Sequence, residues 1–184
     1  MRTACGIALA LARTLGYDTP TASLARLQLL IVVMELADLL SPDAVLTGLK
    51  AGSKKQVLQA LSEHAAGLTG LEERDIFAVV LERERLGTTG VGQGLAIPHG
   101  KLPDLGSITG VFARLAKPVD FESIDRQPVD MVFMLLAPEA AGADHLKALA
   151  RVSRLFRNPS MCEKLRGSVA AGAIYALVTN QKAA

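Results

Sequence analysis

The segment from Gly87 to Lys101 reads GTTGVGQGLAIPHGK, and it decides how the rest of the chain is interpreted. Four of its glycines lie within eight residues, and an apolar run from Leu95 to Ile97 follows them. That run is long enough for a short buried strand, and Pro98 then fixes the approach to His99. Glycines let backbone N–H groups come close to an oxyanion. A nucleophilic imidazole beside such a loop suits phosphoryl transfer.

The common nucleotide-binding patterns do not fit this segment. A Walker loop ending at Gly100-Lys101 needs glycine at position 95 and a hydroxyl side chain at position 102, and both positions are leucine. A dinucleotide fingerprint starting at Gly90 also needs glycine at position 95, and the segment precedes a strand instead of opening a helix. The remaining alternative is a glycine-rich surface turn with a structural histidine.

Hydrophobic periodicity predicts alternating strands and helices on either side of the loop. The central strands are expected at Ile108–Leu115 and Met131–Leu136, with a first strand at Ala44–Leu49. The expected helices are Ser53–Leu68 with Ser53 as cap, Leu71–Leu86, Asp144–Arg157, Pro159–Leu165 after Asn158, and Ser168–Val178. Val57, Leu61, Ala65, Leu68, Ile76, Ala78, Val79 and Val80 are expected to face inward. The polar stretch Asp120–Asp125 is expected to contain one or two short elements. This pattern indicates an α/β sandwich.

Three pieces of sequence stand in a specific order around the loop: Leu81–Gly90 (LERERLGTTG), Ile97–Lys101 (IPHGK) and Asp144–Leu146 (DHL). This ordered set resembles the mannitol–fructose class of enzyme IIA domains of the bacterial phosphotransferase system. Within that class it is most similar to the nitrogen-related, regulatory branch. The resemblance covers about Glu35 to Val178. It implies a three-layer fold, in which a mixed β-sheet carries helices on both faces.

The resemblance also implies the site. His99 is expected to accept the phosphoryl group on Nε2 while its other ring nitrogen donates to a backbone carbonyl. Arg83 and His145 are expected beside it, holding the phosphoryl oxygens. N–H groups of the glycine loop are expected to join them; that loop comprises Thr89, Gly90, Gly92, Gln93 and Gly94. The donor is expected to be an HPr-like phosphocarrier protein. The family transfers phosphate without a bound cofactor, so none is expected.

Gln93 departs from the sugar-transporting members of the family, which commonly carry glutamate six residues before the phosphorylated histidine. An uncharged amide fits the nitrogen branch, where phosphorylation is a signal to downstream regulatory proteins. Two alternatives stay open. One is a sugar-specific enzyme IIA that passes phosphate to a transporter domain; the other is a binding module whose His99 is never phosphorylated.

Without the family pattern, each site residue also has a structural interpretation. Arg83, near the end of a helix, would be a surface charge that complements the helix dipole. His145 would be a histidine at a helix boundary. Arg85 points elsewhere on the helix and is expected to be solvated. His64 lies beside the buried face of the first helix, and we expect a partly buried, hydrogen-bonded structural residue.

Composition favours a single cytoplasmic domain with an aliphatic core. Half of the 184 residues are hydrophobic, but only five phenylalanines and two tyrosines are present. The net charge is only +2 and no basic stripe dominates the sequence, which argues against nucleic acid as a main partner. Cys5 and Cys162 are expected to be free thiols, and three dispersed histidines indicate no metal site. Neither apolar stretch near the N-terminus is long enough to span a membrane.

Residues 1–33 differ from the rest of the chain and are interpreted as a leader of doubtful status. They hold three arginines and one aspartate, and without them the chain has 17 basic and 17 acidic residues. The family resemblance begins only near Met34 and Glu35. We therefore expect residues 34–184 to form the enzyme IIA domain and Met34 to be the natural start, with a genuine N-terminal extension as the alternative.

Overall fold

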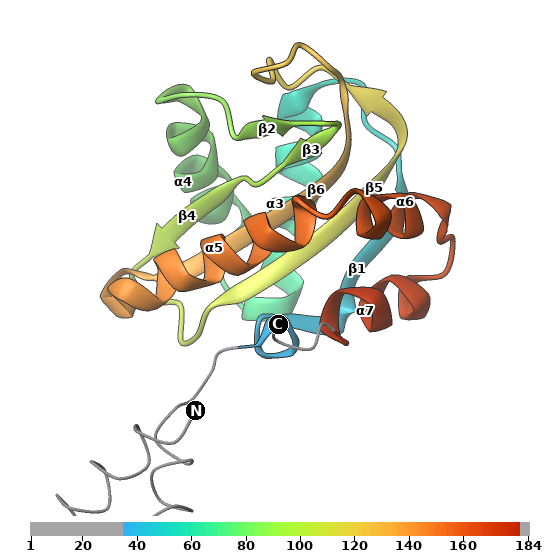
Figure 1. Ribbon diagram of the computed structural model, residues 1–184. Helices are drawn as coiled ribbons and strands as arrows, with labels where there is room; N and C mark the ends of the chain where they lie inside the picture. The colour runs from blue at the N-terminus through green and yellow to red at the C-terminus, as the bar shows by residue number, and fades with distance from the viewer. Residues whose placement is uncertain (1–34, 181–184) are drawn as a thin grey trace, which may run out of the picture. The chain divides into compact units, whose positions relative to one another are not determined.

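Six strands form one mixed sheet in the computed structural model, which describes residues 35–180 (Figure 1). The order along the sheet is β1-β5-β6-β3-β2, and β4 also pairs with β6. β1 is parallel to β5, β5 is antiparallel to β6, and both β3 and β4 are parallel to β6. The strands are β1 Leu40–Leu49, β2 Gly90–Gly92, β3 Leu95–Ala96, β4 His99–Leu102, β5 Thr109–Val119 and β6 Val129–Pro138.

Helices cover both faces of this sheet (Figure 1). The helices of one face are α3 (Lys54–Thr69) and α4 (Glu73–Arg85). The other face carries α5 (Ala143–Phe156), α6 (Pro159–Gly167), α7 (Ala171–Thr179) and the short 3-10 helix η1 (Leu36–Asp38). A second 3-10 turn, η2 (Glu139–Ala141), leads into α5. The expected three-layer α/β architecture is therefore confirmed.

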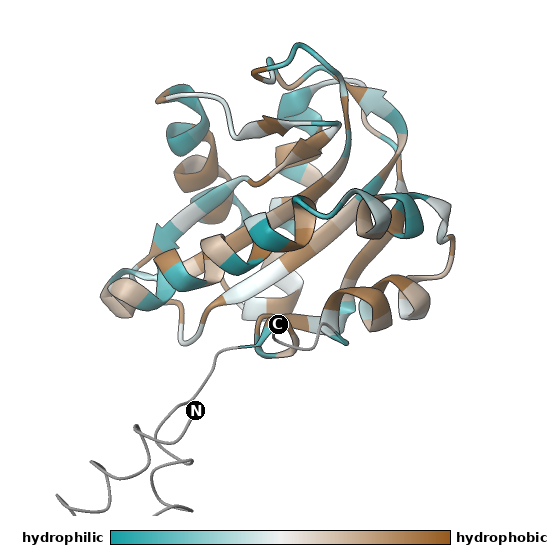
Figure 2. Ribbon diagram, in the orientation of Figure 1, coloured by the Kyte–Doolittle hydropathy of each residue, from teal (hydrophilic) through white to brown (hydrophobic). Residues whose placement is uncertain are grey.

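Alternation along β6 explains why both faces need cover. Met131, Phe133 and Leu135 belong to the core under α5, α6 and α7. Val132 and Met134 belong to the core under α3 and α4, as does Leu136. Because successive strand residues point to opposite faces, a strand that is apolar at every position must be buried on both. Figure 2 shows the corresponding hydrophobic colour along the central strands.

Helix termini follow the capping residues that the sequence predicted. The Ser53 hydroxyl accepts the N–H of Gln56 at 3.3 Å at the start of α3. Asn158 accepts the N–H of Met161 at 3.2 Å at the start of α6, with Pro159 in the first turn. α3 ends at Gly70, whose φ of +74° suits glycine. These local signals placed both helices to within a few residues.

Several details of the predicted elements were wrong. Ala78 is exposed, so the inward stripe of α4 is narrower than its apolar run; Leu68 is half-buried but packs against the core, as expected. Asp120–Asp125 contains no short helix or strand. It is a loop that follows β5, which extends to Val119. α7 begins at Ala171, three residues later than expected. The predictions for Cys5 and for the leader, residues 1–33, lie outside the described residues.

Candidate functional site

His99 lies at the first residue of β4, where two strand segments follow one another along the same edge of β6. β3 pairs with β6 at Met131 and Val132, and β4 pairs with it from Leu135 onward. Between them, the carbonyl of Pro98 accepts the N–H of Leu135 at 2.9 Å. Proline has no N–H to donate, so the strand is interrupted at Pro98. The bond to its carbonyl nevertheless holds the chain on that edge of β6. The interruption places His99 at a defined position on the sheet.

Gly100 allows the helix that carries Arg83 to lie close to β4. A Cβ atom at position 100 would lie 2.6 Å from Cγ1 of Val79 on α4, closer than packed atoms approach. Glycine is therefore required here for close contact of helix and strand. This explains in packing terms why glycine follows His99, and it brings the last turn of α4 beside the imidazole.

The two ring nitrogens of His99 have different partners. Nδ1 lies 2.9 Å from the carbonyl oxygen of Ile97, which can only accept a hydrogen bond, so Nδ1 carries the proton. Nε2 therefore keeps its lone pair, which accepts a hydrogen bond from Nε of Arg83 at 3.0 Å. The same guanidinium donates through Nη1 to the carbonyl of Gly87, also at 3.0 Å. Nε2 is thus unprotonated and faces a cation.

His145, in the first turn of α5, comes to the same place from the other end of the sequence. Its ring centroid lies 5.7 Å from that of His99, and the two ring planes are tilted by 54°. The side chain is 7% exposed, and within the described residues its Nε2 has no hydrogen-bond partner. The positive end of the α5 dipole lies in the same turn. Arg83, His99 and His145 are therefore brought together, as the motif predicted.

Both imidazoles are held neutral near pH 7. Burial lowers the pKa of His99, and the adjacent Arg83 lowers it further, against the opposing effects of the Ile97 carbonyl and Glu84. Burial also lowers the pKa of His145, with smaller contributions from His99 and Lys101. A neutral imidazole with an available lone pair is the nucleophilic form. The electrostatics therefore disfavour protonation of His99.

The glycine loop forms a β-hairpin, in which Gln93 and Gly94 make the two-residue turn between β2 and β3. Both turn residues have positive φ, +57° and +79°, as a primed hairpin turn requires. Three N–H groups of the loop donate within the protein: Thr89 to Glu84, Gly90 to the Thr88 hydroxyl, and Gln93 to Asp125. The loop is thus fixed by hydrogen bonds within itself and to neighbouring segments, and the direct contact of its N–H groups with phosphate stays a prediction.

The loop after β5 runs beside the glycine hairpin, a contact that the sequence did not indicate. The Phe121 carbonyl accepts the Thr88 hydroxyl at 2.7 Å. The Asp125 carboxylate accepts the N–H of Gln93 at 2.7 Å and that of Gln127 at 3.1 Å, and these bonds lower the pKa of Asp125. The polar stretch that follows β5 therefore supports the hairpin along its length.

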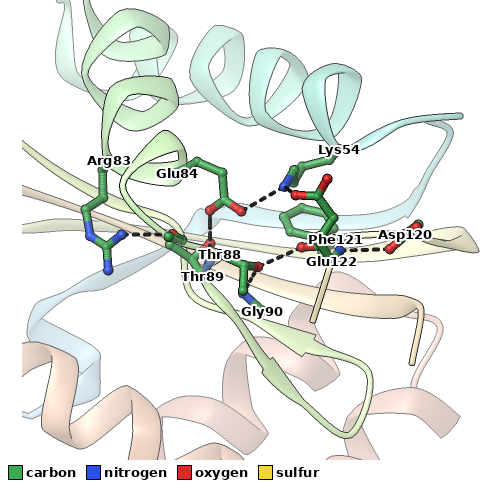
Figure 3. A network of polar contacts seen from close by, with 10 residues as sticks. Lys54, Arg83, Glu84, Thr88, Thr89, Gly90, Asp120, Phe121 and Glu122 are labelled. Atoms are coloured by element: carbon green, nitrogen blue, oxygen red, sulfur yellow. Dashed lines mark hydrogen bonds and ion pairs between the residues drawn. The ribbon is translucent and has the colours of Figure 1, made fainter. Parts of the chain in front are cut away.

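Glu84 is a residue of the site that sequence reasoning missed. It is 6% exposed, and it accepts both the N–H and the hydroxyl of Thr89 while Lys54 lies beside it (Figure 3). The available signal was spacing: Ile76, Val80 and Glu84 follow one another at four-residue intervals on the buried stripe of α4. A carboxylate on that stripe needs partners inside the protein.

The remaining histidine and the neighbouring arginine lie outside the site. His64 contacts the Asp43 carbonyl through Nε2 at 2.6 Å and is half-buried, which confirms its structural role. Arg85 is exposed, as expected. Within residues 35–180, no three histidine, cysteine or acidic side chains cluster as metal ligands would. Cys162 is a buried free thiol. In the part of the chain described, every helix is too short or too polar to cross a membrane.

Comparison with known proteins gives a consistent result. The family described as "Phosphoenolpyruvate-dependent sugar phosphotransferase system, EIIA 2" matches residues 38–181. A nitrogen regulatory protein of Bradyrhizobium diazoefficiens is 61% identical over 145 residues, covering 79% of this chain and 95% of the relative. A nitrogen regulatory protein of Escherichia coli is 36% identical over 148 residues, covering 80% and 91%. The crystal structure of nitrogen regulatory protein IIA-Ntr from Neisseria meningitidis superposes with a TM-score of 0.74 at 34% identity, covering 77% and 97%.

Proposed function

The chain belongs to the enzyme IIA type 2 family of the phosphoenolpyruvate-dependent phosphotransferase system, and on that premise we propose that it accepts a phosphoryl group on His99 and signals by its phosphorylation state. It is a phosphoryl-transfer component of the nitrogen-related branch. The observation that carries the assignment to His99 is its tautomer: Nδ1 is held by Ile97, and the Nε2 lone pair meets Arg83.

The transfer step follows from this geometry. The Nε2 lone pair of His99 attacks the phosphorus of a phosphohistidine on an HPr-like carrier protein, forming the new N–P bond. The N–P bond of the carrier breaks, and its electron pair stays on the carrier's imidazole. The Nδ1 proton of His99 stays on Nδ1 throughout, donated in the hydrogen bond to the Ile97 carbonyl. No cofactor is consumed, because one N–P bond replaces another.

Arg83 has to change partner during this step. In the structure its Nε–H occupies the lone pair that would attack. As the phosphoryl group arrives, the guanidinium would release Nε2 and bind the equatorial oxygens, where charge-assisted hydrogen bonds are strong. The bond from Nη1 to the Gly87 carbonyl keeps the side chain beside the site meanwhile. Arg83 thus both covers the nucleophile at rest and receives the phosphoryl group.

His145 supplies a second partner for the phosphoryl oxygens. A buried ring nitrogen without a hydrogen bond costs about 1–3 kcal/mol, and Nε2 of His145 is in that state. With the ring proton on Nε2, His145 would donate to a phosphoryl oxygen between the two rings, which would end that cost. The N–H groups of the first turn of α5 carry partial positive charge at the same end of the helix. Phosphate bound to His99 is therefore expected to be stabilised by this turn.

The carrier protein is proposed to dock on the surface around these residues. Leu86 is 82% exposed and follows the end of α4, and Leu146 is 66% exposed and follows His145 in α5. Exposed leucines beside a reactive site are typical of a protein-docking surface. Phosphorylation would add about two negative charges within it. Partners that bind one state would be rejected in the other, which is how the modification becomes a signal.

Gln93 supports a regulatory function over a sugar-transport relay. Its side chain is an uncharged amide, where sugar-transporting members of the family commonly carry glutamate. The sugar-relay alternative predicts fast transfer from the phosphorylated protein to a sugar-transporter domain. We expect this transfer to be slow or absent.

The experiment that tests the proposal is intact-mass measurement before and after mixing with a phosphorylated HPr-like protein. We expect an acid-labile gain of ~80 Da, one phosphoryl group. An unchanged mass would contradict the proposal and favour a binding module that is never phosphorylated. We also propose that residues 34–184 contain everything that phosphoryl acceptance requires, since residues 1–33 differ in charge balance from the rest.

A further inference from the structure

Glu84 is a buried carboxylate to which the transfer step above assigns no part. Its side chain is 3% exposed. Oε2 accepts the backbone N–H of Thr89 at 3.0 Å and the Thr89 hydroxyl at 2.6 Å. Oε1 lies 3.2 Å from Nζ of Lys54, the first residue of α3 (Figure 3). Helices α3 and α4 and the glycine loop therefore meet at one carboxyl group.

The positive charge of Lys54 compensates the negative charge of the Glu84 carboxylate. Burial alone would lower the pKa of Lys54, but its ion pairs with Glu122 and Glu84 outweigh burial and raise the pKa. Its Nζ lies 2.6 Å from Oε2 of Glu122, on the loop after β5. The lysine is therefore a cation at all ordinary pH values. Burying a carboxylate is costly unless a partner of this kind is present, so Lys54 is what allows Glu84 to be buried beside Thr89.

The hydrogen bonds of Thr89 continue to the reactive imidazole. The Thr89 carbonyl accepts the N–H of Ile97 at 3.0 Å. The Ile97 carbonyl in turn accepts Nδ1–H of His99 at 2.9 Å. Glu84 is thus connected to the Nδ1 side of His99 through two residues. Its neighbour Arg83 binds the Nε2 side directly.

We propose that Glu84, neutralised by Lys54, is a positioning residue for His99. By holding Thr89 it fixes the Ile97 carbonyl, and that carbonyl fixes the tautomer and orientation of the imidazole. The proposal rests on the function proposed above, because it assumes that His99 Nε2 is the acceptor. Adjacent residues of α4 thereby act on opposite nitrogens of one ring: Glu84 through the loop and Arg83 by contact.

A buried ion pair that serves only stability would account for some of these contacts, so the test must separate the two roles. Glu84→Gln keeps an acceptor for Thr89 but removes the charge opposite Lys54. Thr89→Val removes the hydroxyl donor while keeping the N–H, and Thr89→Ser restores the hydroxyl. The matched control is Glu82→Gln, which removes an exposed glutamate from the same helix.

Three quantities are measured on each variant: the single-turnover rate of transfer from a phosphorylated HPr-like carrier, the carrier affinity, and the His99 tautomer by ¹⁵N NMR. Residues that orient metal-ligating histidines typically contribute about 10–100-fold to activity, and by analogy we expect Glu84→Gln to slow transfer about tenfold. Carrier affinity should stay within about twofold. The fraction of His99 protonated at Nε2 should rise. Thr89→Val should slow transfer, Thr89→Ser should restore it, and Glu82→Gln should match the parent.

The pH profile provides a further signature. The charge of Glu84 opposes the fall in the pKa of His99. Its removal should therefore lower that pKa, and the acid limb of the rate profile should move to lower pH. A loss of melting temperature with unchanged rate, tautomer and pH profile would overturn the proposal. If Glu84→Gln does not fold, parent-like rate and tautomer in Thr89→Val would overturn it instead. The tautomer is measured without a carrier, so failure of phosphoryl acceptance in the parent is a separate result.

Discussion

Replacing Arg83 with lysine tests whether the guanidinium acts in chemistry or only as a surface charge. Arginine uses two separate nitrogens here: Nε donates to Nε2 of His99 and Nη1 to the Gly87 carbonyl, each at 3.0 Å. Lysine keeps the positive charge but has a single ammonium group, which cannot reproduce a planar fork that binds two acceptors. Loss of one strong charge-assisted contact in the transition state costs about 2.7–4 kcal/mol, or two to three orders of magnitude in rate.

Single-turnover transfer from a phosphorylated carrier, measured beside carrier affinity, is the appropriate assay. We expect Arg83→Lys to slow transfer by about two orders of magnitude with nearly unchanged affinity, because the contact strengthens only as the phosphoryl group moves. Arg85→Lys, at an exposed position two residues along, is the control and should match the parent. A rate for Arg83→Lys within about threefold of the parent, less than 1 kcal/mol, would refute the assigned role.

Three further predictions concern the turn, the pH dependence and the leader. Gln93→Asn should stabilise the fold by about 0.5 kcal/mol, seen as a rise of about 1–2 °C in melting temperature, because asparagine tolerates the positive φ of this turn better than glutamine; an unchanged or lower melting temperature would contradict this. Since the pKa values of His99 and His145 are both lowered from 6.5, transfer should stay fast as pH falls through 6.5 and decline only below it. The same shifts contribute stability that is present above pH 6.5 and lost as pH falls through the folded-state values, and a rate midpoint above 6.5 would argue against a neutral acceptor. A chain that starts at Met34 should fold and accept phosphate as well as the full chain does, and a large loss of thermal stability would show instead that residues 27–33 complete the core.

The parts of the fold that sequence could predict are those with strong local signals. β6 is apolar at nearly every position, and Ser53 and Asn158 are capping residues at helix starts, so the strand and both helices were located correctly. The ordered motif likewise anticipated that Arg83, His99 and His145 meet, although they come from three elements. Short-range patterns and a recognised motif were sufficient for these.

The parts that could not be predicted depend on contacts between distant segments. Asp120–Asp125 carries polar residues with no periodicity, and only the folded hairpin shows that Asp125 accepts the N–H of Gln93. Glu84 stands within a run of charges; its four-residue spacing from Val80 places it on the buried stripe of α4, but only the structure shows that Lys54 and Thr89 are its partners there. Single-sequence periodicity contains no information on such pairings, because each partner alone looks like solvated surface.

The assignment of His99 as the phosphoryl acceptor is tested most directly by replacing it. The parent protein and His99→Ala are mixed with a phosphorylated HPr-like carrier and their intact masses compared, with His64→Ala, a change at a structural histidine, as the control. We expect the acid-labile gain of ~80 Da, one phosphoryl group, in the parent and in His64→Ala and none in His99→Ala. Persistent labelling of His99→Ala, with the phosphoryl group mapped to His64 or His145, would contradict the assignment.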